Sequence, residues 1–159
     1  MLAAVALATA ALSGCSDKSM SAPVPRAAER CPVTLPGGKV PSAAPKGFDH
    51  GNRSLGVALW PGGELVAGRL PDGSSYAEVM PDGGIAAKLG WWRGAIGELT
   101  IRGERLDASA PPLRADIPDG YGRTGFQATG VIFPTEGCWK VVGSVGRASL
   151  TFVVLVRDR

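Results

Sequence analysis

The fold of this chain is decided by the stretch Pro134-Thr-Glu-Gly-Cys-Trp-Lys-Val-Val-Gly-Ser-Val-Gly-Arg-Ala-Ser-Leu-Thr-Phe-Val-Val-Leu-Val156. Two arms rich in β-branched and aromatic residues, 138–142 and 148–156, flank residues 143–147, which contain the glycines that a tight reversal needs. This pattern predicts a β-hairpin. The second arm is apolar on both of its faces, so we expect it to lie in the middle of a sheet with another layer packed over it.

Turn motifs recur at intervals of ten residues upstream of this hairpin. They are Trp60-Pro-Gly-Gly, Leu70-Pro-Asp-Gly and Met80-Pro-Asp-Gly-Gly. Proline at the first corner, followed by glycine or Asp-Gly, is typical of β-turns. Short strands are therefore expected between the motifs, arranged as an up-and-down meander. With further strand patterns downstream and no amphipathic helix after residue 15, the sequence predicts an all-β, antiparallel β-sandwich.

The N-terminus has the pattern of a bacterial lipoprotein signal peptide. Residues 1–14 are uncharged and apolar, and this run is too short to span a bilayer as a helix. The run ends in Leu12-Ser-Gly-Cys15, which resembles the lipobox. The resemblance implies that Cys15 receives a lipid and becomes the new N-terminus. The alternatives are an ordinary secretory signal or a misassigned start, and the missing basic region suggests that translation begins further upstream.

Residues 15–30 comprise the lipidated cysteine and a segment rich in Ser, Ala and Pro that has few large apolar side chains. Such a segment cannot bury enough surface to order itself, so it is interpreted as a flexible tether. Residues 31–159 then form one domain. We expect a lipid-anchored protein of the bacterial cell envelope, in the outer membrane where the cell has two membranes, because Ser16 replaces the aspartate that retains lipoproteins in the inner membrane.

The remaining cysteines, Cys31 and Cys138, form an even pair in a chain that matures in an oxidising compartment. A disulfide between them is expected. The alternative is two free buried thiols. Metal binding is not expected, because His50 and two distant cysteines lack paired-ligand spacing.

Several function classes are disfavoured by the sequence. The 17 basic and 14 acidic residues are interspersed, without the basic stripe that nucleic-acid binding needs. The string Gly120-Tyr-Gly-Arg-Thr-Gly125 satisfies GxGxxG, but prolines and a further strand flank it instead of a helix, so no cofactor is expected. His50 lies near Asp49 and Ser54 on a proline-rich loop, which does not indicate a catalytic triad. No catalytic residue is assigned, and the chain is predicted not to be an enzyme.

Aromatic residues give the one indication of a ligand surface. Trp91 and Trp92 are neighbours, so on a strand they face opposite sides and at most one fills the core. Together with Arg93 and Tyr121 they could form a platform for a sugar ring or a peptide. The alternative is that both tryptophans pack, one in the core and one under the N-terminal segment.

One family resemblance extends over residues 31–156. The motifs that carry it are Cys31-Pro-Val-Thr, Trp91-Trp-Arg-Gly94, Tyr121-Gly, Gly125-Phe-Gln, Phe133-Pro-Thr-Glu-Gly-Cys-Trp139, Val145-Gly and Leu150-Thr-Phe-Val153. They resemble a set of small bacterial secreted proteins and lipoproteins of uncharacterised function. The resemblance implies an immunoglobulin-like sandwich and brings no activity or site residues. Antibody-type domains place a tryptophan between their two cysteines, whereas here Cys31 precedes the strands and Trp139 directly follows Cys138.

These observations together predict a lipid-anchored, non-catalytic binding module. Its expected partners are the membrane, through the lipid on Cys15, and an envelope glycan or protein. The competing prediction is an envelope hydrolase that acts on a glycan or a peptide.

Overall fold

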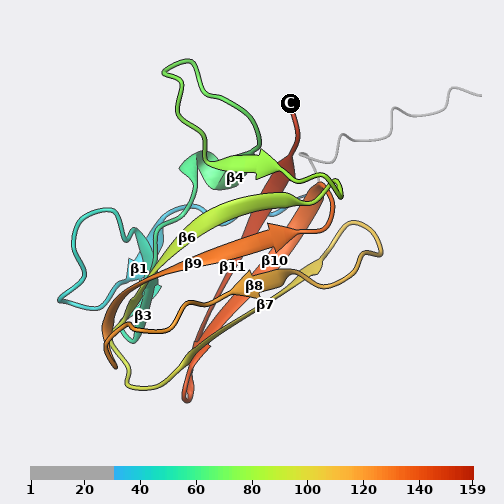
Figure 1. Ribbon diagram of the computed structural model, residues 1–159. Coiled ribbons are helices and arrows are strands. Elements are labelled where there is room, and N and C mark those ends of the chain that lie inside the picture. The colour runs from blue at the N-terminus through green and yellow to red at the C-terminus, as the bar shows by residue number, and fades with distance from the viewer. Residues whose placement is uncertain (1–30) are drawn as a thin grey trace, which may run out of the picture.

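The computed structural model describes residues 31–159, which form two packed β-sheets (Figure 1). The predicted signal peptide (1–14), the lipidation of Cys15 and the tether (15–30) lie outside the described residues. Within residues 31–159 there is one turn of 3-10 helix, η1 (Pro61–Gly63), and no α-helix. The predicted all-β sandwich architecture is confirmed.

The first sheet contains seven strands and is built around the long strands β6 (Ile85–Arg93) and β9 (Gly125–Phe133), which pair antiparallel along their whole lengths. The short strands of this sheet are β1 (Gly37–Lys39), β2 (His50–Asn52), β3 (Leu55–Val57), β5 (Ala77–Val79) and β8 (Arg114–Asp116). Both β3 and β5 pair with the same edge of β6, β3 near its end and β5 near its start. The sheet order is β1-β2-β3-β6-β9-β8.

The second sheet has the order β4-β11-β10-β7. Its strands are β4 (Glu64–Val66), β7 (Leu99–Arg105), β10 (Gly137–Val145) and β11 (Ala148–Arg157). The predicted hairpin is β10–β11, and it turns through only Gly146 and Arg147, with Gly146 at φ 56°. Since β11 lies between β10 and β4, its placement inside the sheet is confirmed, although β4 pairs with only its last three residues.

Two expectations about strand pairing are wrong. The sheets are mixed and not antiparallel throughout, because β1 pairs parallel with β2 and β4 pairs parallel with β11. The turns after Trp60, Leu70 and Met80 do not build a meander either. The chain leaves the first sheet after β3, enters the second as β4 and returns as β5. Of these three turns, only the one after Met80 therefore joins two strands of a hairpin, β5 and β6. Turn chemistry signals a reversal of direction but not the edge at which the next strand pairs.

The core lies between the sheets and is filled by alternating side chains of the long strands. The β11 positions predicted to face one way, Leu150, Phe152, Val154 and Val156, are all buried in it. Trp91 of β6 crosses the core and rests on the backbone of Gly143 in β10. A Cβ added at Gly143 would lie 2.2 Å from the Trp91 ring, so only glycine fits there. This contact ties the two sheets together.

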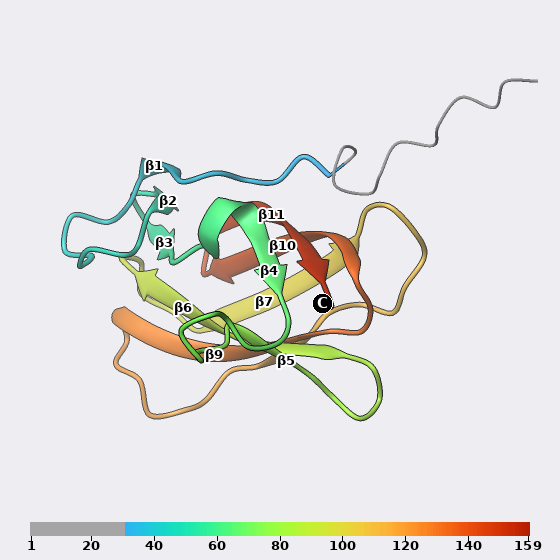
Figure 2. The ribbon, with the colours of Figure 1, turned by 90° about the horizontal axis from the view of Figure 1, so that it is seen from above.

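The predicted disulfide between Cys31 and Cys138 is present, with the two Cα atoms 5.4 Å apart. It packs with Leu155 on the side of β11 that faces away from the main core. From there the chain follows the free edge of β11, where the Thr34 hydroxyl accepts a hydrogen bond from the Val153 N–H at 2.8 Å. His50 and Asn52 of β2 continue this cover through their side chains, which bond the Thr151 and Ser149 carbonyls. Figure 2 shows the chain passing β11 on its way to β1. The β11 edge is therefore largely protected from pairing with another chain.

No helix within residues 31–159 has the length and apolar character needed to cross a membrane.

Candidate functional site

The candidate residues singled out in the sequence separate at the end of β6. Trp91 is fully buried in the core and cannot contact a ligand. Trp92 faces the outer side of the first sheet and is half-buried, which confirms that the two neighbours face opposite sides. Arg93 returns to the inner side and is only 4% exposed. Tyr121, on the loop between β8 and β9, is exposed.

Four rings make contact over the outer face of the first sheet. Trp92 lies edge-on to Phe48 with ring centroids 5.8 Å apart, Phe48 meets Phe126 at 6.1 Å, and Phe126 meets Tyr121 at 6.1 Å. We call these four residues the aromatic row. The rings of Phe48 and Phe126 lie close above Gly90, where β6 has no side chain to displace them. Each contact has the edge-to-face geometry that aromatic rings prefer.

A hollow of about 310 Å³ opens beside Trp92, and we call it the Trp92 hollow. Its lining combines the indole with polar side chains and with glycine backbone. The lining residues are Pro41, Ser42, Ala43, Arg53, Trp92, Arg93, Gly94, Thr124 and Gly125. Segments far apart in the sequence therefore meet there, with Pro41 packed close against Gly94.

Arg53, at the rim of this hollow, is the one residue other than glycine with a positive φ in the described part of the chain, at 71°. The turn around it is held from both sides. The Asn52 carboxamide oxygen accepts hydrogen bonds from the N–H groups of Ser54 (3.2 Å) and Leu55 (3.0 Å), and the Arg53 N–H bonds the Lys39 carbonyl. An arginine in this conformation is strained and persists only where its surroundings hold it.

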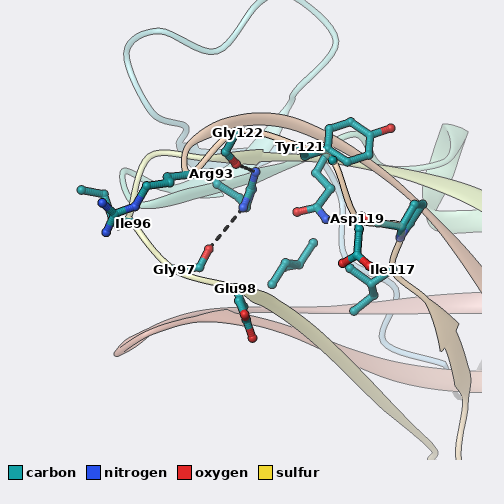
Figure 3. A pocket seen from close by; sticks show the side chains of 13 residues that line it. Arg93, Ile96, Gly97, Glu98, Ile117, Asp119, Tyr121 and Gly122 are labelled. Atoms are coloured by element: carbon teal, nitrogen blue, oxygen red, sulfur yellow. Dashed lines mark hydrogen bonds between the residues drawn. The ribbon is translucent and has the colours of Figure 1, made fainter.

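A larger cavity of about 590 Å³, the end cavity, lies on the other side of Arg93, between the loop after β6 and the loop before β9 (Figure 3). Arg93 bridges these loops, because its Nη1 donates to the Gly97 carbonyl at 3.2 Å and its Nη2 donates to the Gly122 carbonyl. Figure 3 shows Asp119 and Tyr121 across the cavity from Arg93, and Glu98 below it.

Two buried polar atoms of the cavity lining have no hydrogen-bond partner. They are Nε of Arg93 and Oε1 of Gln127, which come from the adjacent strands β6 and β9 and whose residues are 4% and 5% exposed. The carboxamide nitrogen of Gln127 donates to the Pro118 carbonyl at 3.2 Å. A buried donor or acceptor that stays unpaired costs free energy. A ligand that offers an acceptor to Arg93 would recover part of this cost.

Titratable side chains with shifted pKa values lie away from the Trp92 hollow and from the end cavity. Hydrogen bonds from the Ser74 side chain and backbone lower the pKa of Asp72, and hydrogen bonds from the Gly84 N–H and Arg114 lower that of Asp82. Both aspartates serve turns. His50 is bonded to the Thr151 carbonyl and does not approach either hollow. Within residues 31–159, no three His, Cys, Asp or Glu side chains cluster as metal ligands would.

Sequence reasoning missed several members of this region. Phe126 directly precedes the buried Gln127, so the period-two alternation of β9 was a signal that it faces outward. Phe48 precedes β2 and lies outside any strand, so no alternation in the sequence indicates which way its side chain faces. Nothing in the sequence placed Glu98 or Asp119 beside Arg93, because they come from separate loops.

Comparisons of the chain with models of known protein families, with curated proteins and with solved structures find no match.

Proposed function

We propose that this protein is a lipid-anchored module of the bacterial cell envelope that binds a glycan without chemically changing it. The aromatic row, with the Trp92 hollow beside it, is the observation that carries the proposal. Two of these rings, Phe126 and Tyr121, are exposed, and Phe48 and Trp92 are half-buried. Such rings in mutual contact on an outer face, next to a hollow lined by polar groups, are typical of a binding surface rather than of a packed core.

The chemistry of the Trp92 hollow suits a sugar ring. The indole of Trp92 offers an apolar face for the C–H side of the ring. Ser42, Thr124 and Arg53 also line the hollow, and hydroxyl and guanidinium side chains are able to hydrogen-bond sugar hydroxyls. Phe126 and Tyr121 extend the apolar surface so that a chain of several sugar units can lie along it.

The position of the hollow supports an anchored arrangement. Cys31, where the described chain begins, is bonded to Cys138 near the start of β10. Arg93 and Gly97 lie at the other end of the sandwich, where Gly97 approaches Val145 and Gly146 at the β10–β11 turn. A tether attached at Cys31 would thus leave the Trp92 hollow facing away from the membrane.

The immunoglobulin-like assignment belongs to the same proposal. Two packed sheets joined by a core of alternating side chains, with Trp139 fully buried beside Cys138, support it. The parallel pairings of β1 with β2 and of β4 with β11 are variations at the sheet edges.

A hydrolase is the second candidate, and one observation favours it. The carboxylates of Glu98 and Asp119 line the end cavity together. Pairs of carboxylates carry out glycoside hydrolysis when they flank the scissile bond. An activity of this kind would be located in the end cavity and not at the Trp92 hollow.

The test is glycan binding by the full chain, measured against oligosaccharides released from bacterial envelopes. Trp92→Ala should weaken binding about tenfold or more, since a tryptophan that becomes covered by its partner often contributes much of the binding free energy. Leu106→Ala, which removes an exposed apolar side chain elsewhere, serves as the control. Release of new reducing ends that stops in a Glu98→Gln variant would favour the hydrolase instead.

The anchor is tested separately by metabolic labelling with a fatty-acid probe. We expect label on the wild-type chain and none on Cys15→Ser. Equal labelling of the two chains would remove the lipid anchor from the proposal and leave the glycan surface untouched.

A further inference from the structure

We propose that the Trp92 hollow is selective for a sugar that carries a carboxylate, such as a uronic acid, and that Arg53 is the residue that sets this selectivity. The inference rests on the proposed glycan binding and specifies the class of sugar. It follows from three observations: the charges of the residues that line the hollow, the absence of an anionic partner for Arg93, and the backbone conformation of Arg53.

The lining of the Trp92 hollow carries two cations and no carboxylate. The cations are Arg53 and Arg93. Residues 31–159 contain four ion pairs, and neither arginine belongs to any of them. A hollow whose only charges are uncompensated guanidinium groups attracts anions and repels cations.

Arg93 is the deeper of the two cations. Its guanidinium is held by the neutral carbonyls of Gly97 and Gly122, and its Nε has no partner. A buried cation without an anion is costly. The carboxylates of Glu98 and Asp119 line the end cavity on its far side, but neither lies within ion-pair distance of it. A carboxylate in the Trp92 hollow would thus meet a positive field from below.

Arg53 is the accessible cation at the rim. Its side chain is exposed, while its backbone is fixed in the left-handed region by the Asn52 carboxamide and the Lys39 carbonyl. Glycine or asparagine would occupy this position at lower cost. Strained residues concentrate at ligand-binding positions, and the planar guanidinium binds a carboxylate through two hydrogen bonds. This combination assigns carboxylate recognition to Arg53.

The experiment compares an oligogalacturonate with its methyl ester, in which a methyl group on each carboxyl removes the charge, by calorimetric titration of the full chain. The variant is Arg53→Asn, because asparagine tolerates the positive φ and keeps the turn. The matched control is Arg147→Asn, which removes one exposed, unpaired cation at the β10–β11 turn and so lowers the net charge by the same amount. A third chain, Trp92→Ala, tests the proposed glycan surface itself.

Wild-type protein and Arg147→Asn should bind the acid about tenfold more tightly than the ester, as expected for a charge-assisted contact at a partly exposed site. Arg53→Asn should lose most of this preference, because only the deeper charge of Arg93 remains, and its affinity for the ester should match that of the wild type. Added salt should reduce the preference for the acid.

Equal wild-type affinity for acid and ester would overturn the assignment of carboxylate recognition to Arg53. The same loss of preference in Arg147→Asn as in Arg53→Asn would also overturn it. The proposed glycan binding would stand after that result if Trp92→Ala still weakened binding about tenfold or more. No binding of either ligand or of envelope oligosaccharides would remove both proposals.

Discussion

Trp91 and Trp92 are neighbours on one strand, yet they belong to two different regions of the molecule. Trp91 lies between the sheets with no exposed surface, against the backbone of Gly143 and near the ring of Phe152. Trp92 lies on the outer face of the first sheet, with Phe48 on one side and an open hollow on the other. The same side chain is therefore used once to hold the fold and once to offer a surface.

Glycines make both arrangements possible, in opposite ways. On the inner side, Gly143 allows the Trp91 ring to approach the opposite backbone, which closes the core. On the outer side, Gly90 leaves room for Phe48 and Phe126 to lie over the sheet. We therefore expect stability to depend on the inner side and ligand binding on the outer side. Four variants test how completely the two are separated.

The largest effect is expected from Trp91→Ala. It removes a fully buried ring from the centre of the core and should lower the free energy of unfolding by about 3–5 kcal/mol. That is a large share of the roughly 5–15 kcal/mol that holds a domain. Chemical denaturation monitored by circular dichroism measures it. An unchanged transition midpoint would show that Trp91 does not link the sheets.

Loss of the disulfide comes next. Cys31 and Cys138 are 107 residues apart in the sequence, so the bridge constrains a long loop of the unfolded chain. The double substitution Cys31→Ala, Cys138→Ala should lower the free energy of unfolding by about 2–4 kcal/mol. Because the bridge lies at the far end of the sandwich, glycan affinity should stay unchanged below the melting transition. Loss of affinity in folded protein would contradict the separation of the two regions.

Gly143→Ala should cost about 1–3 kcal/mol, because the new methyl group overlaps the Trp91 ring. A double-mutant cycle makes the test specific. In a Trp91→Ala background the same substitution should cost much less, since the ring that it strikes is gone. Gly37→Ala is the matched control, as its Cβ would have no neighbour closer than 4.0 Å. Additive costs in the cycle would show that the two residues do not interact.

The smallest effect on stability is expected from Trp92→Ala. The side chain is half-buried and its ring contact with Phe48 is worth about 0.5–1.5 kcal/mol beyond the area that it covers. Thermal unfolding should therefore shift only slightly, although glycan affinity falls about tenfold or more. If the free energy of unfolding fell as far as in Trp91→Ala, the aromatic row would contribute to stability as much as the core does, and the separation of the two regions would be wrong.

The local sequence pattern was sufficient to predict those parts of the fold in which the strands that pair are also neighbours in the sequence. The β10–β11 hairpin, the two faces of β11 and the opposite orientations of Trp91 and Trp92 follow from the period of two along a strand. The pairing of Cys31 with Cys138 followed from their number. The β3–β4–β5 path could not be predicted in this way, because a turn motif does not specify which sheet receives the next strand. The hollows were equally inaccessible, since Pro41, Arg53, Trp92 and Thr124 come from four separate segments.

The sequence by itself determined an all-β chain, the hairpin at its C-terminal end, one disulfide and the opposite orientations of Trp91 and Trp92. These properties depend on neighbours along the chain or on counts of residues. Only the tertiary structure decided that Trp91 is buried, that Phe48 and Phe126 join Trp92 and Tyr121 in one row, and that Arg93 lies between two hollows without an anionic partner. The reason is that packing brings together residues that are tens of positions apart in the sequence. The free energy of such a contact depends on both residues, so the sequence around either one does not reveal it.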